Sequence, residues 1–582
     1  MKMMKKISPL LISVFGTLIG QITFSNMSDS AGINLSVYGE GVCVFDYNND
    51  GLDDIFFAIR QNSHQLLYKN LGDFEFENVS ASLGVNIIMN ARTPVAADIN
   101  NDGFLDLFIG ASDGESKMLM NVNGDYFTDI TQISGIQIDT QVRGASWFDY
   151  NNDGFLDLYV GRLYDTNLLF QNNGDETFTE VGENVGATGP SVAGLIMGLG
   201  IVDYDRDGDD DIFMTQDNYA GNILFKNEHN VTFSDVSNIT GTGLDVMGMG
   251  VAFGDINRDG FFDIYTTNLN ENSLLLNDSS GIFTDISVSS NTQDDQGSMA
   301  WGVFFFDANN DGFLDIYNNN ESAFGQIPNS LYINNGNNVF DNRAAEAQVD
   351  LWNSGLGSAY SDFDLDGDLD IVLSGSPSEN GSLILLRNDL DDSHNWIQFN
   401  LKKGTGDPFA IGTVVECFTN GITQSQFISA GNGYCSQNSF VQHFGLGNNT
   451  FVDSVIVYWS DMEKETFLIP SINQSYTLIK GSGIPLSVQN KDISTKYFIV
   501  GNNFPNPFNG KTIIPISFME SGDASILLYN ALGIEMMVDY FKIDGPKTIH
   551  YNLSVKNIPS GVYMYSIKQN NHSQIGKINF IK

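Results

Sequence analysis

The sequence predicts an all-β protein whose largest part is a seven-bladed β-propeller with calcium loops. One acidic nine-residue pattern, D-x-[DN]-x-D-G-x-x-D, recurs seven times among the 582 residues. The copies begin 51 to 55 residues apart, and a fixed period of this length is typical of repeat architectures. Each repeat also contains four short apolar runs separated by turn residues, which indicates one four-stranded sheet per repeat.

The seven loops share a set of oxygen-bearing side chains. Asp stands at positions one, five and nine, Asp or Asn at position three, and Gly at position six. Calcium takes six to eight hard oxygen ligands, and alternate residues of a tight loop can supply them. Glycine suits a sharp turn because it adopts a positive φ without steric cost. The pattern therefore predicts up to seven structural Ca²⁺ ions, one in each loop.

The predicted ligands are the side chains at positions one, three, five and nine and the backbone carbonyl at position seven, where the side chain varies. They are Asp46, Asn48, Asp50, Leu52 and Asp54; Asp98, Asn100, Asp102, Phe104 and Asp106; Asp149, Asn151, Asp153, Phe155 and Asp157; Asp203, Asp205, Asp207, Asp209 and Asp211; Asp255, Asn257, Asp259, Phe261 and Asp263; Asp307, Asn309, Asp311, Phe313 and Asp315; and Asp362, Asp364, Asp366, Asp368 and Asp370. No copy has Glu at position twelve, and strand-like runs follow the loops, so they are not EF-hands.

A second interpretation is that the loops are only Asp-Gly hairpin turns. Such a turn needs no carboxylate or amide at three further fixed positions, so calcium is favoured over a plain turn. Magnesium fits less well, because it retains its waters and is rarely held by an all-protein cage.

The seventh repeat lacks its fourth strand, and the N-terminus carries a segment that fits the gap. After Asn388 the chain has no Phe-x-Asp run of the kind that ends the other repeats. Phe24-Ser25-Asn26-Met27, followed by Ser30, parallels Phe127-Thr128-Asp129-Ile130, followed by Ser134. We therefore expect the N-terminal strand to complete the last blade, which would also remove an exposed sheet edge.

Charge and the N-terminal residues bear on location and partners. A formal net charge of −44 argues against nucleic acid and anionic membranes as partners. Lys2, Lys5 and Lys6 precede an apolar stretch at residues 9–19, which is too short to span a bilayer and predicts a secretory signal peptide cleaved near Gly20-Gln21. No transmembrane segment is expected.

Three cysteines are too few for a disulfide framework. Cys417 and Cys435 could pair across a hairpin, and the sequence leaves this open. Cys43 is expected to be a small buried apolar residue of the first strand.

The segment after the repeats resembles the ASPIC/UnbV domain, which follows calcium-loop propellers in cartilage acidic protein-like proteins. The matching residues are Ala410-Ile411-Gly412, the run from Gly431 to Asn438, His443-Phe444-Gly445-Leu446-Gly447, and Val452-Asp453-Ser454-Val455 leading to Trp459. Ser460-Asp461-Met462 departs from the usual Pro-Ser-Gly after this Trp, which affects a turn. The acidic loops likewise resemble FG-GAP/VCBS repeats. The resemblance implies fold and calcium binding, but no defined activity.

The last segment resembles the C-terminal sorting domain of the type IX secretion system. Asn503-Phe504-Pro505-Asn506-Pro507, Tyr529-Asn530-Ala531-Leu532-Gly533 and Ile558-Pro559-Ser560-Gly561-Val562 appear in the order of that family. The resemblance implies a small β-sandwich, contact with the secretion machinery through residues 497–582, and a secreted or cell-surface location.

The expected domains are a signal peptide (1–20), a propeller closed by its N-terminal strand (21–392), an ASPIC/UnbV domain (393–480), a linker (481–496) and a sorting domain (497–582).

No catalytic or cofactor motif stands out, so an enzyme is not the favoured interpretation. The six His residues lack zinc spacing, and no nucleophile elbow or phosphate loop is present. His443 is expected to have a structural hydrogen-bonding role. We expect inter-blade loops to carry a set of polar and aromatic residues, namely Arg143, Trp147, Tyr164, Tyr219, Trp301 and Trp352. Trp301 and Trp352 could stack on sugars, although blade packing is preferred.

The predicted function is that of a secreted or cell-surface calcium-binding propeller, acting as an adhesion or ligand-binding module for an unknown protein or glycan. The alternative is an extracellular propeller enzyme, a lyase or hydrolase, that degrades polysaccharide.

Overall fold

The computed structural model describes residues 22–33, 35–189, 195–229, 231–294, 297–321, 327–377, 382–390, 394–404, 406–482, 485–487, 498–500, 508–518, 521–530, 535–545, 547–554, 559–569 and 572–581. The chain is all-β, as predicted, with 52% strand and 3% helix. The predicted signal peptide and its cleavage point lie outside the described residues.

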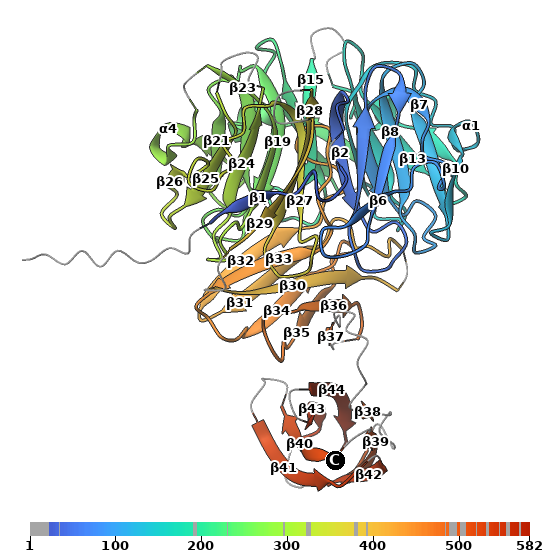
Figure 1. The fold of residues 1–582 in the computed structure, drawn as a ribbon, viewed down its shortest axis with the longest axis vertical. Coiled ribbons are helices and arrows are strands. Elements are labelled where there is room, and N and C mark those ends of the chain that lie inside the picture. The colour runs from blue at the N-terminus through green and yellow to red at the C-terminus, as the bar shows by residue number, and fades with distance from the viewer. Residues whose placement is uncertain are drawn as a thin grey trace, which may run out of the picture.

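Four-stranded antiparallel sheets follow one another through the first two thirds of the chain (Figure 1). The first sheet contains β2 (Gly39–Phe45), β3 (Asp54–Ile59), β5 (Leu66–Asn70) and β6 (Phe76–Asn78). The second contains β7 (Ile88–Ala97), β8 (Asp106–Asp113), β9 (Lys117–Val122) and β10 (Tyr126–Asp129), with the short β4 (Ser63–His64) paired on β7. The third contains β11 (Val142–Phe148), β12 (Asp157–Arg162), β13 (Leu168–Asn172) and β14 (Phe178–Glu180).

The remaining sheets repeat this plan. The fourth contains β15 (Ile196–Val202), β16 (Asp211–Gln216), β17 (Ile223–Glu228) and β18 (Thr232–Asp235). The fifth contains β19 (Gly248–Gly254), β20 (Asp263–Asn270), β21 (Ser273–Asn277) and β22 (Phe283–Asp285). The sixth contains β23 (Ser298–Phe306), β24 (Asp315–Asn320), β25 (Ser330–Asn334) and β26 (Phe340–Asn342), and β20 also pairs with β23. Single helical turns follow the fourth strand in sheets two to five: α1 (Thr131–Ser134), α2 (Gly182–Val185), α3 (Ser237–Thr240) and α4 (Ser287–Ser290).

The seventh sheet takes its fourth strand from the N-terminus. It contains β27 (Ser354–Ser361), β28 (Asp370–Ser376), β29 (Leu383–Asn388) and β1 (Phe24–Asn26). Strand β1 runs antiparallel to β29, with Phe24 opposite Asn388. Phe24 is 2% exposed and packs in a core shared with the sixth sheet. The N-terminal strand therefore occupies the place expected for it.

A hydrogen bond of one type links each sheet to the one before it. An Asn that is the last or the last but one residue of the third strand donates from Nδ2 to the carbonyl at loop position two of the preceding unit, at 2.8–3.2 Å. The donors are Asn70, Asn121, Asn172, Asn227, Asn277, Asn334 and Asn388. Because Asn70 of the first unit bonds to Phe363 of the seventh, the series closes into a ring.

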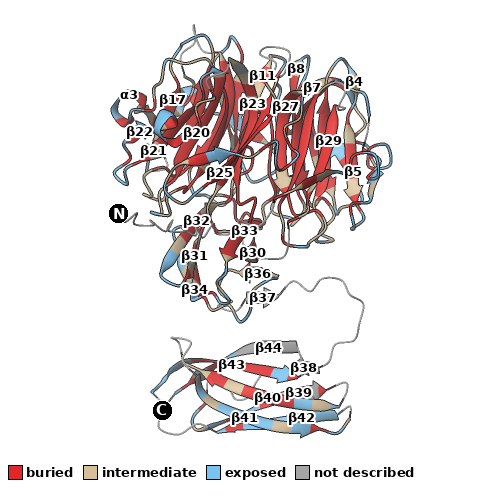
Figure 2. Ribbon diagram, turned by 60° about the vertical axis from the view of Figure 1, so that its left-hand side comes forward, coloured by how far each residue is buried: buried red, intermediate tan, exposed pale blue. Residues whose placement is uncertain are grey.

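The burial of each strand explains how apolar its sequence is. In the first unit β2 and β3 are buried along their whole length, which explains the apolar runs at residues 42–45 and 55–59. The fourth strands, such as β6, are mostly exposed. In Figure 2 the inner strands are red and the rim is paler.

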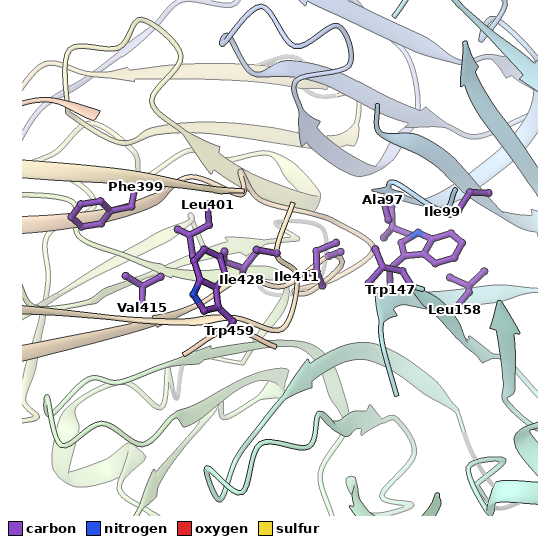
Figure 3. Packing of buried hydrophobic residues seen from close by; sticks show 14 of the residues in the cluster. Ala97, Ile99, Trp147, Leu158, Phe399, Leu401, Ile411, Val415, Ile428 and Trp459 are labelled. Carbon is purple, nitrogen blue, oxygen red and sulfur yellow. The ribbon is translucent and has the colours of Figure 1, made fainter. Parts of the chain in front are cut away.

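The next module consists of two further four-stranded sheets. One contains β33 (Gln442–Gly447), β30 (Asn395–Lys402), β36 (Ser475–Ile479) and β37 (Pro485–Ser487). The other contains β32 (Ile422–Phe427), β31 (Val414–Thr419), β34 (Ser454–Tyr458) and β35 (Lys464–Phe467). Its core, which includes Trp459, continues through Ile411 to Trp147 of the third ring sheet (Figure 3).

The C-terminal module has a core of its own. One sheet contains β38 (Phe498–Val500), β39 (Lys511–Phe518) and β42 (Lys547–Ser554). The other contains β41 (Glu535–Ile543), β40 (Gly522–Tyr529), β43 (Gly561–Gln569) and β44 (His572–Phe580). Ile516, Ile526 and Ile567 are fully buried among these strands.

Candidate metal centres

All seven acidic loops adopt the same backbone conformation. The glycine at position six has φ between 85° and 95° in every copy, as the sequence predicts. Position four is also left-handed, with φ between 54° and 62°, which the sequence analysis did not anticipate. The residues at position four are Asn49, Asn101, Asn152, Arg206, Arg258, Asn310 and Leu365. Asn tolerates this conformation better than most residues. The recurrence of Asn at position four could therefore have predicted the left-handed backbone from the sequence.

The carboxylate at position one organises the loop from inside. Asp46 accepts the N–H of Asp50 at 3.1 Å and that of Gly51 at 2.8 Å. The same two bonds recur in the other six loops. Position five in turn accepts the N–H of position seven, as Asp50 does from Leu52. These hydrogen bonds hold the carboxylates at positions one and five inside the loop.

The Asp at position nine has a different structural role from the side chains at positions one, three and five. Asp54 accepts the N–H of Asn70 at 2.8 Å and the N–H of Tyr47 at 3.2 Å, so it ties the third strand to the loop. All seven position-nine residues make both bonds and are 0% exposed. Burial raises the pKa of each well above that of a free Asp.

The position-one carboxyls also have raised pKa values. Burial, reinforced by neighbouring carboxylates, raises the pKa to about 6 for Asp46, Asp98 and Asp149, to about 7 for Asp203 and Asp255, and to about 8 for Asp307 and Asp362. Neighbouring carboxylates repel one another, so each disfavours ionisation of the position-one carboxyl. A divalent cation bound in the loop would offset this repulsion.

The fourth and seventh loops fit a metal ion best. Their position-three atoms, Asp205 Oδ1 and Asp364 Oδ1, are buried and have no hydrogen-bond partner. Among the described residues, carboxylates of Asp203, Asp205 and Asp211, and of Asp362, Asp364 and Asp366, lie within 4.8 Å of one another in their respective groups. An all-oxygen donor set of this kind suits a hard cation such as Ca²⁺. In the other loops the position-three Asn instead donates to the position-five carboxylate, as Asn48 does to Asp50 at 3.2 Å.

A lysine already sits against the fourth loop. The Lys226 ammonium contacts the carboxylates of Asp205 and Asp207, the latter at 2.8 Å. It offsets part of the charge of a loop that has four carboxylates at positions one, three, five and nine, where most loops have three. Lys69 contacts Asp50 of the first loop at 3.1 Å in the same way.

Side chains at position four link neighbouring loops. Asn49 donates to the Gly103 carbonyl at 2.8 Å, and Asn101 to that of Gly154 at 3.1 Å. Three equivalent bonds, from Arg206, Arg258 and Asn310, join loops four to seven. The printed bonds thus connect loops one to three and loops four to seven in two series at one end of the ring.

The second module covers this end of the ring. Gln398 donates to the position-one Asp362 at 2.7 Å, and His394 Nδ1 lies 2.7 Å from the Asn309 carbonyl. His443 Nε2 lies 2.6 Å from Asn310 Oδ1, and burial lowers the pKa of His443 to about 3. A neutral, buried imidazole has the structural role predicted for His443.

Residues 430–439 of the module, here called the axial segment, run along the centre of the ring. Backbone hydrogen bonds hold it there: the backbone N–H of Trp147 donates to the Ala430 carbonyl, that of Gly433 to the Val251 carbonyl, and that of Gln437 to the Val42 carbonyl, each at 2.9 Å. These partners belong to the first strands of sheets three, five and one, which lie on different sides of the axis. The sequence placed this segment in the module but gave no sign of its insertion into the ring.

Tyr434 is the polar centre of the axial segment. Its hydroxyl donates to Glu40 at 3.1 Å and accepts from Arg92 at 3.1 Å and from Arg143 at 3.2 Å. Arg92 and Glu40 also form a buried ion pair at 2.7 Å. Trp301 packs on Tyr434 with ring centroids 4.7 Å apart.

Several predicted placements are wrong, and others are refined. Arg143 and Trp147 lie in β11, and Trp301 in β23, rather than in loops. Trp301 packs within the ring, as preferred, whereas Trp352 is 50% exposed. The possible Cys417–Cys435 disulfide is absent: all three cysteines, Cys43 included, are free and buried. Cys435 is held in the axial segment, where its thiol donates to the Arg143 carbonyl.

Three family models match the chain. The FG-GAP-like repeat matches residues 46–109, 98–160, 149–214 and 203–266. The ASPIC and UnbV model matches residues 404–485, and the secretion system C-terminal sorting domain matches residues 502–581. These are the three resemblances expected from the sequence. The sixth and seventh loops lie beyond the FG-GAP matches, and their relation to the others comes from their shared geometry.

Curated relatives carry the name cartilage acidic protein 1. The Xenopus tropicalis protein is 28% identical over 411 residues, covering 64% of this chain and 61% of that protein. The Mus musculus protein is 31% identical over 263 residues, covering 43% and 40%. The chain thus spans less than two thirds of the length of these relatives. A solved Agrocybe aegerita lectin structure, which concerns recognition of non-reducing terminal N-acetylglucosamine, aligns at 20% identity and a TM-score of 0.37, covering 54% of this chain and 82% of that one. So weak a likeness assigns neither fold nor ligand.

The sorting-domain match indicates secretion or cell-surface localisation. In the described part of the chain, no helix has the length and apolar character needed to cross a membrane.

Proposed function

We propose that the closed ring is a seven-bladed β-propeller whose loops bind structural Ca²⁺, and that the chain serves outside the cell as an adhesion or ligand-binding module. The observation that carries the calcium assignment is the partnerless buried oxygens of Asp205 and Asp364 inside clustered carboxylates. The closed series of Asn hydrogen bonds supports the propeller.

Calcium has a structural role in this proposal. In each loop the ligands are the residues at positions one, three, five and nine and the carbonyl at position seven, as predicted above. Position nine also holds the third strand, so a cation bound there would join three parts of one blade. The lysines beside loops one and four would compete with the metal, so occupancy would differ among the loops.

The domain limits proposed are those expected from the sequence: a signal peptide at 1–20, the propeller at 21–392, the ASPIC/UnbV module at 393–480, a linker at 481–496 and the sorting domain at 497–582. The family matches at 404–485 and 502–581 support the last two modules.

A binding role is favoured over catalysis because of what fills the ring. The axial segment occupies the centre with a tyrosine hydroxyl already bonded to Glu40, Arg92 and Arg143. Pockets that hold substrates are usually open concave sites with convergent polar groups, and here the convergent groups are paired with one another. A polysaccharide lyase or hydrolase would need its site elsewhere on the surface.

The decisive experiment is a thermal melt of the mature protein, titrated with Ca²⁺ and then with EGTA. Extracellular calcium sites bind in the ~10⁻⁴ to 10⁻³ M range. At ten times the dissociation constant one site stabilises by about 1.4 kcal/mol, so seven would approach roughly 10 kcal/mol. A large calcium-dependent rise in Tm, smaller with Mg²⁺, is expected.

An unchanged Tm would indicate that the loops are only hydrogen-bonded turns, and it would overturn the calcium assignment. Binding of the calcium-loaded protein to cells and glycan arrays tests the second part of the proposal. Incubation of the protein with extracellular polysaccharides should release no product. Reproducible release of product would indicate an enzymatic role in place of the binding role.

A further inference from the structure

One face of the second module lies on the sixth and seventh acidic loops. Strands β30 and β33 pair so that Gln398 lies opposite His443 and Trp396 lies opposite Gly445. Residues directly opposite each other in an antiparallel pair project to the same side of the sheet. These four residues, here called the contact patch, therefore form one small area of the module surface. Each of them contacts one of the two loops or a residue that does.

Gln398 holds the position-one carboxylate of loop seven. Its Nε2 donates to Asp362 Oδ2 at 2.7 Å, and both residues are buried. Its Oε1 accepts from the Ser475 hydroxyl of β36, so the orientation of the amide is fixed within the module. Trp396 packs on the same loop, because a Cβ on Gly367 at loop position six would come within 1.8 Å of the indole. Module side chains thus touch both the carboxylate and the turn of loop seven.

His443 reaches loop seven through Asn310, the position-four residue of loop six. Asn310 Nδ2 donates to the Gly367 carbonyl at 3.1 Å and to Asp368 Oδ1 at 2.8 Å. The remaining amide oxygen, Oδ1, is therefore the acceptor in the 2.6 Å contact with His443 Nε2. His443 Nε2 thus carries the proton, and Nδ1 accepts from Gln398 Nε2 at 3.3 Å. One hydrogen-bonded chain links the contact patch to both loops.

Gly445 brings the module backbone onto loop six. A Cβ at this position would come within 2.0 Å of Asp307 Oδ2, so a side chain there would displace the position-one carboxylate. The Gly447 N–H, at the end of β33, donates to the Asn310 carbonyl at 2.8 Å and holds the strand against the same loop. The contact patch therefore covers the position-one carboxylates of both loops, Asp307 and Asp362.

The other loop with four carboxylates is held in a different way. In loop four, Lys226 of the third strand contacts both Asp205 and Asp207. The residue at the same place in the seventh sheet is Arg387, which forms its ion pair with Asp389, outside the loop. The contacts from Gln398 to loop seven are thus not a feature of every repeat. They belong to the place where the module meets the ring.

Loop seven is open to an ion on the side away from the module. Asp366, at position five, is exposed, whereas Asp362 is buried beneath Gln398. Carboxylates that bind metals are oriented by a second layer of hydrogen-bond donors, and loss of such a donor typically weakens metal affinity about 10–100-fold. Gln398 stands in this relation to Asp362.

We propose that Gln398 and His443 are positioning residues of the loop-seven metal centre, and that Ca²⁺ bound there strengthens the docking of the second module on the ring. The two effects are reciprocal, because a docked module that favours metal binding is itself favoured by the metal. The inference rests on the proposed calcium binding of the loops. It adds the residues outside the loops that control one site.

The first test follows metal binding at loop seven. Tb³⁺ serves as the probe in the mature full chain, and its luminescence is excited through tryptophan. Trp396 packs on loop seven, so the signal that is lost in Trp396→Phe reports on ions beside this residue. Asp364→Asn should remove most of the same component, which assigns it to loop seven. Displacement of Tb³⁺ by Ca²⁺ then gives the calcium affinity of the site.

Gln398→Ala should weaken the calcium affinity of the Trp396-dependent component about tenfold or more. Gln65→Ala is the matched control, because it removes a buried glutamine that accepts the Ile59 N–H in the first sheet, and it should leave this component unchanged. His443→Ala should act like Gln398→Ala. His443→Gln retains an N–H donor at the end of the side chain and should restore most of the affinity.

The second test follows the docking of the module. Hydrogen exchange of the β30 and β33 amides is measured in Ca²⁺ and in EGTA. Ca²⁺ should slow this exchange in the wild-type chain and should slow it much less in Asp364→Asn. Asp205→Asn makes the same change in loop four and is the matched control. It should retain the full calcium-dependent protection of β30 and β33.

Unchanged calcium affinity in both Gln398→Ala and His443→Ala would overturn the positioning role, while calcium binding by the loops would stand. Equal calcium-dependent protection of β30 and β33 in the wild-type chain and in Asp364→Asn would overturn the coupling to docking. If neither Tb³⁺ nor Ca²⁺ binds to any loop, the calcium proposal fails and this inference fails with it.

Discussion

At the scale of the residue, the acidic loops are dominated by carboxylates that the fold buries together. Position-one Asp residues accept two backbone N–H bonds, yet burial and neighbouring charge still raise their pKa to between about 6 and 8. Hydrogen bonds therefore offset only part of the cost of ionising them. We therefore expect the position-one carboxyls to lose a proton when a cation binds.

Proton and calcium should compete for these sites as pH changes. In the folded protein the pKa of these carboxyls is raised from 3.8 to between about 6 and 8, so in the absence of metal the fold binds protons more tightly than the unfolded chain does. The stability gained from this protonation is fully present below about pH 4. It is lost as the pH rises through 6 to 8. The calcium-induced rise in Tm should therefore be larger at pH 8 than at pH 5.5. Melting in EGTA and in Ca²⁺ at both pH values checks this, and equal increments would contradict it.

Asp364 distinguishes a metal ligand from a turn residue. Asp364→Asn should lower the Tm in saturating Ca²⁺, because a tenfold loss of affinity at one site removes about 1.4 kcal/mol. In EGTA the same change should leave the Tm unchanged or raise it, since it relieves repulsion with Asp366. Asp139→Asn, at an exposed Asp outside the loops, should do neither. A loss of Tm that is equal with and without calcium would indicate a purely structural residue.

At the scale of the element, the strand that closes the ring is short and comes from the far end of the chain. Strand β1 has three residues, but it supplies the edge that the seventh sheet lacks and buries Phe24. Hydrogen bonding along β29 and burial of one aromatic ring give this small element a large effect. The sixth and seventh sheets share the core in which it lies.

Phe24→Ala should destabilise the ring by about 3–5 kcal/mol, the usual range for a buried Phe. Chemical unfolding followed by tryptophan fluorescence measures it, because Trp147 and Trp301 lie in other sheets of the ring. Tyr126→Ala, in the exposed fourth strand β10, should cost far less. If both variants unfold alike, β1 does not contribute to closure.

At the scale of the whole molecule, the ring and the second module are joined through the axis. The axial segment bonds to first strands of several sheets, and the module core is continuous with Trp147. The module also lies over the acidic loops through Gln398 and His443. Ring, loops and module should therefore unfold together.

Tyr434→Ala should lower the Tm of a single transition that includes both ring and module, because it removes both the aromatic ring that packs on Trp301 and the hydroxyl shared by Glu40, Arg92 and Arg143. Tyr434→Phe keeps the packing on Trp301 and should have a smaller effect. Calorimetry of the mature protein tests this. Two independent transitions for residues 22–390 and 394–482 would contradict the coupling.

The repeat, the loop residues and the strands could be predicted from sequence because each depends on neighbours in the chain. Spacing within nine residues places carboxylates around one turn, and apolar runs mark strands buried on both faces. The missing strand of the seventh unit was also predictable, since Phe24-Ser25-Asn26 copies a pattern seen in other repeats. The three modules could be recognised by their ordered motifs.

Only the tertiary structure decided how distant residues meet. The insertion of Tyr434 between Glu40 and Arg143, the free state of Cys435, and the hydrogen bond from Gln398 to Asp362 all depend on contacts between segments separate in the chain. Such contacts follow from ring closure and module docking, which leave no local pattern in the sequence. Local spacing determined which groups each repeat carries, and packing of repeats against one another decided which of those groups are buried, paired or left open to a ligand.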